Sequence, residues 1–356
     1  MNALDSQDTD SSGAPRLSRR RIWAFAAGSA LLLAIAGGYG LHAAHRHAAV
    51  LASGSKAPAT ASLPLDGAPG ILYVSTAVGA DYEHLAEAGT SGPTDATAVA
   101  SLGCERAYAA ADTLVCLRTR GSLVATQYAE VYRDSTGTPR LIRSVQLPGI
   151  PSRARVSADG RMVAWTVFVS GDSYNGPQFS TRAGVLDLKT GTVIPSIETF
   201  TSYVDGAPYH AVDINYWGIT FESDDVHFYV TMGSAGRTWL MRGDLATETL
   251  QPVIENVECP SLSPDGTRIV FKKRISSSLT APWRLYVLDL KTLRETPLAE
   301  TRSVDDQAAW LGNGEVMYQV PQASGPGYDI WEVPADGSGT PRPLIRNGFS
   351  PVAVGG

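Results

Sequence analysis

The sequence predicts an all-β fold, a six-bladed β-propeller of four-stranded antiparallel blades, preceded by one N-terminal transmembrane helix. Three observations predict it. Residues 22–41 form an uncharged apolar segment, and beyond them a turn-and-strand pattern recurs. The strands of that pattern are apolar on both faces. A recurrence of roughly 40–50 residues is typical of propellers and other repeat arrays.

The apolar segment 22–41 has the length of a transmembrane helix. Its sequence, IWAFAAGSALLLAIAGGYGL, contains no charged residue, and such a helix spans the ~30 Å hydrocarbon core of a bilayer. Basic residues precede it and are sparse after it. The positive-inside rule therefore predicts a cytoplasmic tail at 1–21 and export of everything beyond the segment. The basic residues are Arg16, Arg19, Arg20 and Arg21.

A cleaved signal peptide is the alternative for this N-terminus. Small-x-small motifs at 34–36 and 50–52 have the form of cleavage sites. The protein is then secreted instead of anchored as a single-pass membrane protein. In both cases the main domain is exported. Residues 42–66 are rich in Ala, Ser and Pro and predict a flexible linker.

The clearest repeat unit begins at Ser261. It reads S-L-S-P-D-G-T-R-I-V-F-K and is followed, from Trp283, by W-R-L-Y-V-L-D-L-K-T. Asp265-Gly266 predicts a tight hairpin turn, and the segments on either side of it predict strands. Asp289 closes the next turn of the unit.

Three further copies and two weaker ones make six repeats over residues 67–356. The copies close with turns at Asp187, Asp244 and Pro334, and the weaker units begin near Gly70 and Cys104. Residues 349–354 resemble the first strand of a repeat that then stops. Residues 71–75 resemble the second strand of a repeat whose first strand is missing. We expect the two ends to complete one blade and close the ring. Seven blades or an open sandwich are the alternatives.

The strand centres are apolar at consecutive positions, as in Val163-Ala164-Trp165 and Val270-Phe271. A sheet with one face in water does not need this pattern. In a propeller each blade lies between two neighbours, so both of its faces are buried.

Cys104 and Cys116 are candidates for a disulfide. If the turn between them centres on Ala110, they face each other across an antiparallel hairpin, within disulfide range. An exported domain permits oxidation. Two buried free thiols are the alternative. Cys259 occupies the position of Cys104 in its own repeat, opposite Phe271, and is expected to stay unpaired.

Composition excludes some partners and cofactors. The formal net charge is −6, which gives no general attraction to nucleic acid. Three cysteines lack the spacing of a zinc site. His42, His45 and His47 could hold a metal, but a solvated stretch next to the membrane explains them without one. We expect no cofactor and no metal.

The repeat resembles the WD-like repeats of TolB-type β-propellers. The resemblance lies in Ser-Pro-Asp-Gly, a strand, and then Trp-x-Leu-Tyr-Val-x-Asp-Leu, and is strongest at 150–191 and 257–300. It implies a platform that binds partners in the cell envelope. The chain departs from TolB in having a membrane segment where TolB has a separate α/β domain.

No catalytic motif is found. The string nearest to a G-x-S-x-G nucleophile elbow, at 171–176, has one residue too many and reads as a polar loop. Asp224-Asp225 is expected to stabilise a hairpin turn, and Asp305-Asp306 is expected to lie in a solvated loop. Asp213 and the 305–306 pair are the carboxylates placed to reach a central channel.

The predicted function is a non-catalytic binding module at the cell envelope. Its partner is expected to be a protein, a peptide or a cell-wall component, recognised through loops around the channel. The alternative is a propeller enzyme of lyase or lactonase type with its site in the channel. The candidate contact residues lie in two insertions, 171–182 and 202–212: Tyr174, Asn175, Tyr203, Tyr209 and His210.

Overall fold

The computed structural model describes Leu63, Leu65 and residues 68–92, 95–121, 125–134, 138–169 and 180–355. The predicted tail (1–21), the predicted transmembrane segment (22–41) and the linker (42–66), apart from the two leucines, lie outside these residues. Within the described part of the chain, no helix is long and apolar enough to cross a membrane.

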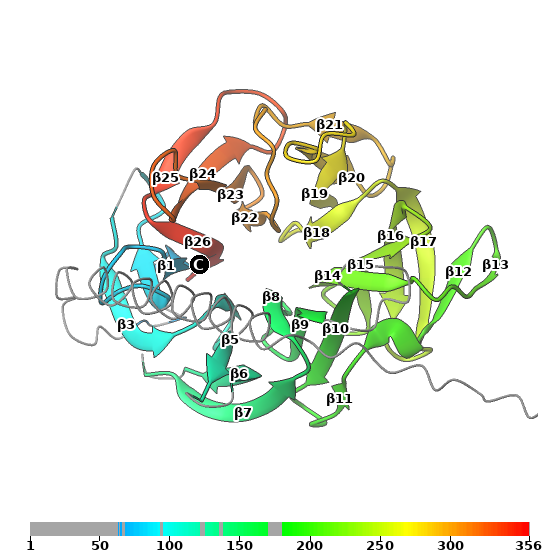
Figure 1. Ribbon diagram of the computed structural model, residues 1–356, viewed down its shortest axis with the longest axis horizontal. Coiled ribbons are helices and arrows are strands. Elements are labelled where there is room, and N and C mark those ends of the chain that lie inside the picture. The colour runs from blue at the N-terminus through cyan, green and yellow to red at the C-terminus, as the bar shows by residue number, and fades with distance from the viewer. Residues whose placement is uncertain are drawn as a thin grey trace, which may run out of the picture. The chain divides into compact units, whose positions relative to one another are not determined.

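The described residues form six sheets, here called blades 1 to 6, arranged radially around a central axis (Figure 1). Starting from the strand nearest the axis, blade 1 contains β26 (Gly348–Val354), β1 (Gly70–Ser75), β2 (His84–Ala88) and β3 (Ala98–Gly103). Blade 2 contains β4 (Arg106–Ala110), β5 (Thr113–Arg120), β6 (Thr126–Arg133) and β7 (Arg140–Leu147). Blade 3 contains β8 (Ile150–Val156), β9 (Met162–Val169), β10 (Ser180–Asp187) and β11 (Val193–Ile194).

The other three blades follow the same plan. Blade 4 contains β14 (Asn215–Phe221), β15 (His227–Ser234), β16 (Arg237–Asp244) and β17 (Thr249–Glu255), and is extended by β12 (Thr201–Val204) and β13 (Ala207–Tyr209). Blade 5 contains β18 (Glu258–Leu262), β19 (Arg268–Arg274), β20 (Trp283–Asp289) and β21 (Glu295–Pro297). Blade 6 contains β22 (Ala309–Leu311), β23 (Glu315–Pro321), β24 (Tyr328–Pro334) and β25 (Arg342–Ile345). The six-bladed prediction is confirmed.

The two ends of the propeller share one sheet, as predicted. β26 pairs with β1 in antiparallel register, with Leu72 opposite Val352 and Ser75 opposite Gly348. The last strand of the chain therefore supplies the first strand of blade 1. This pairing closes the ring, so that blade 1, like the other described blades, lies between two neighbours.

The described residues form six hydrophobic core clusters, one between each pair of neighbouring blades. In β1, Ile71 and Tyr73 pack against blade 6, whereas Leu72 and Val74 pack against blade 2. Alternate side chains of a strand point to opposite faces, so an unbroken apolar run buries both. Leu63 and Leu65, 4% and 3% exposed, join the cluster between blades 1 and 2. The packed domain therefore begins a few residues before the predicted boundary.

The repeated turn motif has a clear physical basis in blades 3 and 5. Ser263 Oγ donates to Asp265 Oδ1 at 2.6 Å and accepts from the Arg268 backbone N–H at 3.0 Å. Ser157 bonds in the same way to Asp159 and to the Met162 backbone N–H. The glycine of each turn, Gly160 or Gly266, has φ of +81° or +70°, where a Cβ is disfavoured. The serine and aspartate side chains thus stabilise the hairpin turn, and glycine allows its positive φ.

The chain passes from one blade to the next at one end of the axis, here called the entry face. β7 ends at Leu147 and β8 begins at Ile150, so both lie at that end. Antiparallel pairing then places the links between the second and third strands of every blade on the entry face too. The turns that close each repeat, at Asp187, Asp244 and Asp289, lie on the opposite face.

Blade 4 departs from the four-stranded prediction. The insertion 202–212 was expected to be a loop around the channel, but β12 and β13 form a hairpin instead, with Tyr203 opposite Pro208. β12 pairs in parallel with β17, the outermost strand of the blade. The hairpin therefore extends the outer edge of the sheet, away from the axis (Figure 1).

Cys104 and Cys116 form a disulfide, with their Cα atoms 5.4 Å apart. The predicted register of the hairpin was wrong. Its turn residues are Ala111 and Asp112, so Ala107, and not Cys104, lies opposite Cys116. Cys104 precedes β4, and its backbone N–H donates to the Glu83 carbonyl at 2.7 Å. Among the described residues Cys259 is a free, buried cysteine.

A count of reactive thiols tests this arrangement. We expect none to be alkylated in the native protein, because Cys259 is only 2% exposed. One should react after unfolding without reductant, and all three after reduction. Replacing Cys104 and Cys116 by alanine should cost about 2–4 kcal/mol of unfolding free energy. Three reactive thiols in unfolded, unreduced protein would contradict the disulfide.

Candidate functional site

A small polar cavity lies at the entry end of the axis, between the first strands of blades 2, 3, 6 and 1. Its volume is about 20 Å³, enough for a small polar group and far below a typical small-molecule site. Its charged wall is formed by four residues, here called the arginine cluster: Arg106, Arg153, Arg155 and Asp306.

Asp306 is the centre of the arginine cluster. Its Oδ2 lies 3.1 Å from Arg106 Nη1, and its Oδ1 lies 3.0 Å from Arg153 Nη1. The carboxylate also accepts the Gln307 backbone N–H at 2.7 Å, and it is 5% exposed. The expectation that Asp306 lies in a solvated loop was therefore wrong. Ring closure brings β4 and the segment before β22 together although they are far apart in sequence.

The arginines keep Asp306 ionised. Burial by itself raises the pKa of the Asp306 carboxyl, but Arg153 and Arg106 outweigh burial and hold that pKa below its usual range. A carboxylate with a low pKa and two arginine partners is a weak proton acceptor at neutral pH. Asp306 therefore suits electrostatic recognition better than acid–base catalysis.

A second group of charges adjoins the arginine cluster. Lys272 is 3% exposed, and its Nζ lies 2.6 Å from Asp305 Oδ1. Burial lowers the pKa of the Lys272 ammonium, but Cys259, Asp305 and Glu258 raise it more, and the net shift is upward. Cys259 Sγ lies 3.8 Å from Arg153 Nη2. Asp305 is exposed, and its partner is the buried lysine.

The predicted contact residues do not line the cavity. Tyr203 lies in the outer hairpin. Tyr209 packs within blade 4, with its hydroxyl 2.9 Å from Ser234 Oγ, and His210 is exposed just beyond β13. Asp213 accepts hydrogen bonds from Ser234 Oγ and the Ala235 backbone N–H, which lower its pKa. Asp213 therefore holds a turn. Tyr174 and Asn175 lie outside the described residues.

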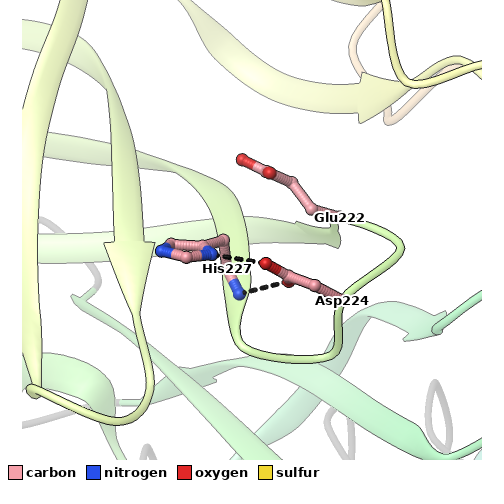
Figure 2. A group of neighbouring side chains, drawn as sticks. All are labelled: Glu222, Asp224 and His227. Carbon is pink, nitrogen blue, oxygen red and sulfur yellow. Dashed lines mark hydrogen bonds and ion pairs between the residues drawn. The ribbon is translucent and has the colours of Figure 1, made fainter.

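Glu222, Asp224 and His227 form the group of described residues whose side chains could together hold a metal ion (Figure 2), with ligand atoms within 4.8 Å of one another. Each already has a protein partner. Asp224 Oδ2 lies 2.6 Å from His227 Nδ1, and Glu222 accepts from Arg242 Nε at 2.6 Å. Burial raises the pKa of Asp224, but bonds from the His227 ring and the backbone lower it to about 2. The group supports the turn between β14 and β15, as predicted for Asp224.

Sequence reasoning missed the three arginines of the cluster. A signal was present in Ser152-Arg153-Ala154-Arg155-Val156, where two charges alternate within a first strand. A first strand is buried near the axis, so charges there indicate a polar axial site. Arg106 carries no such signal, because a single arginine at a strand start is usual.

Comparison with known proteins concerns the fold. No protein-family model matches the sequence, and no curated protein matches it at a significant level. Among solved structures, TolB from Acinetobacter baumannii is 17% identical, with a TM-score of 0.53, and the match covers 81% of this chain and 66% of that one. The chain has the fold of a TolB-like β-propeller.

Two other solved structures match as well. A chain of the nidogen/laminin complex is 11% identical, with a TM-score of 0.50, and the match covers 80% of this chain and 98% of that one. The tricorn protease is 11% identical, with a TM-score of 0.45, and the match covers 82% of this chain and 34% of that one. At such identities the likeness concerns the fold alone.

Replacing Asp306 tests the arginine cluster. Asp306→Asn leaves the partly buried Arg106 and Arg153 without their carboxylate, and should cost about 3–5 kcal/mol of unfolding free energy at neutral pH. Asp95→Asn is the control, because Asp95 is 78% exposed and lies 3.8 Å from the exposed Arg346. It should cost about 0–1 kcal/mol. Denaturant unfolding of both variants measures the difference.

The low pKa of Asp306 predicts that the stability difference between wild type and Asp306→Asn depends on pH. The pKa of Asp306 is lower in the folded protein than in the unfolded chain. The ionised carboxylate therefore contributes fully to the unfolding free energy above the unfolded pKa of about 4. This contribution is lost as the pH falls through the folded pKa. The advantage of wild type over Asp306→Asn should therefore shrink on acidification below pH ~4. An equal stability of wild type and variant at pH 7 would contradict the buried ion pair.

Proposed function

We propose that the chain is an exported, membrane-anchored binding module that recognises a protein, peptide or cell-wall component through its entry face, without catalysis. One observation carries the proposal. The four most exposed large apolar side chains of the described residues lie on that face: Leu279 at 98%, Val212 at 80%, Ile150 at 61% and Ile275 at 53%.

This distribution favours an interaction surface. Single exposed apolar residues are ordinary, but the four most exposed ones lie on one face, whereas Val193 and Leu293 on the opposite face are only 38% and 42% exposed. Val212 belongs to the link that enters blade 4, and Ile275 and Leu279 to the link between β19 and β20 of blade 5. Ile150 begins β8. Loops on a rigid scaffold are the usual carriers of recognition.

The axial site favours recognition over catalysis. Its charged groups are guanidiniums and one carboxylate held in its ionised form by two of them. Guanidinium groups donate hydrogen bonds in a fixed geometry and keep their charge. The cavity of about 20 Å³ also suits a single side chain better than a whole small substrate.

Export and anchoring rest on two observations. The apolar segment 22–41 follows a basic tail, as in a signal anchor. The disulfide between Cys104 and Cys116 is a bond that forms and persists outside the reducing cytosol. The resemblance of the repeats to those of TolB-type propellers, which implies a platform in the cell envelope, agrees with such a location.

A capture experiment from membranes tests the binding function. The full-length chain, tagged on its N-terminal tail, should enrich an envelope component over an identically tagged anchor comprising residues 1–66 alone. Val212→Ser/Leu279→Ser should reduce the capture at least about tenfold, because apolar anchors dominate such interfaces. Val193→Ser/Leu293→Ser is the matched control on the opposite face, where these side chains are 38% and 42% exposed.

Two outcomes would count against the binding function. One is the absence of any envelope component enriched over the anchor. The other is an equal loss of capture for the two double variants, because it would show no preference for the entry face.

A further inference from the structure

Among the residues that the structure describes, Arg155 is a buried cation without an anionic partner. Arg155 is 5% exposed. Its Nη2 donates to Ser261 Oγ at 3.2 Å, and its guanidinium lies 4.4 Å from the centre of the Tyr108 ring. Its Nε is buried and has no hydrogen-bond partner in the described part of the chain. Among the described residues, no carboxylate lies within ion-pair distance of it.

The cavity as a whole carries the same imbalance. Three guanidiniums face one carboxylate, and Asp306 is already shared by Arg106 and Arg153. Arginine does not lose its proton inside proteins. Buried charges are ordinarily paired, because removing an unpaired ion from water is costly. The nearby Asp305 is bound to Lys272 and does not correct the imbalance.

The position of the cavity makes it reachable from outside. The side chains of Arg106 and Arg153 remain 21% and 13% exposed, so solvent reaches the wall that Arg155 completes. Arg153 Nε, like Arg155 Nε, is buried and donates to no hydrogen-bond acceptor among the described residues. Ser152, Gln307 and Ser350 add polar groups to the lining.

We propose that this cavity binds a carboxylate group presented by the partner, with Arg155 as its principal counter-ion. The planar fork of a guanidinium matches the two oxygens of a carboxylate. A cavity of about 20 Å³ suits that small group. The carboxylate comes from an acidic side chain or from the C-terminus of a peptide. This inference rests on the proposed binding function and names the chemistry that the entry face recognises.

Two pairs of peptides distinguish the sources. N-acetyl-glutamate amide carries a side-chain carboxylate, and N-acetyl-glutamine amide is its neutral counterpart. N-acetyl-triglycine carries a terminal carboxylate, and its C-terminal amide is neutral. Each is titrated at millimolar concentration into the full chain in chloride-free buffer of constant ionic strength, with binding followed by calorimetry and thermal unfolding. At least one carboxylate peptide should bind at least about tenfold more tightly than its neutral counterpart.

Arg155→Met tests the assignment of the residue. Methionine keeps an apolar contact with Tyr108 and removes the charge, so the variant should be as stable as wild type, or more stable, without ligand. It should lose the preference for the carboxylate peptide at least about tenfold. Arg143→Gln is the control, since Arg143 is exposed and bonds to the Gly191 carbonyl. It should bind as wild type does.

Three results would overturn the carboxylate proposal. The first is that neither carboxylate peptide binds more tightly than its neutral counterpart. The second is that Arg155→Met keeps the preference for the carboxylate peptide. The third is that chloride binds as tightly as the carboxylate peptides, which would make the cavity a general anion site. The membrane capture separates this failure from failure of the binding function. Capture that survives Arg155→Met but is lost in Val212→Ser/Leu279→Ser would leave the binding function standing and remove the carboxylate.

Discussion

Burial of both faces of every sheet is the constraint on which the structure depends. Consecutive side chains of β1 belong to different clusters, one shared with blade 6 and one with blade 2. Each fully buried Val, Leu or Phe contributes about 1.5–3 kcal/mol relative to an exposed one. β26 contributes to both clusters beside blade 1, with Val352 and Val354 in the one shared with blade 2 and Ala353 packed against the one shared with blade 6. The fold is therefore cooperative around the ring, and its two ends must meet.

The same closure creates the axial site. First strands from different blades converge at the axis, so residues distant in sequence become neighbours there. Arg106 and Asp306, which form an ion pair, are 200 residues apart. The charges that meet are too buried to be ordinary surface groups, and Arg106 and Arg153 share the single carboxylate of Asp306. Arg155 stands outside that pairing, which is why the site points to an external anion.

Most of the fold could be predicted from the sequence because its determinants are local. The S-x-D-G turns, the apolar strands and the incomplete repeats at the two ends each carry a signal within a few residues. The outer hairpin of blade 4 could not be predicted, because its pairing with β17 depends on a distant strand. The register between Cys104 and Cys116 failed for another reason: a one- or two-residue shift of a turn is not visible in its sequence.

The candidate site was predicted less well than the fold. Sequence reasoning placed the contact residues in aromatic insertions, and the described ones, Tyr203, Tyr209 and His210, belong to the outer part of blade 4 instead. Asp306 was noticed but interpreted as solvated, since burial of a carboxylate depends on arginines from other blades. A site assembled at the axis is by nature a product of the three-dimensional ring.

Cross-linking the two ends of the propeller tests ring closure most directly. Leu72 and Val352 are opposite each other in the pairing of β1 with β26. Cysteines at both positions should form a disulfide on mild oxidation, mapped by mass spectrometry, and the bond should raise stability toward denaturant. A control pair at positions 72 and 193 should not cross-link. Failure of the 72–352 pair to oxidise in folded protein would contradict closure by the two ends.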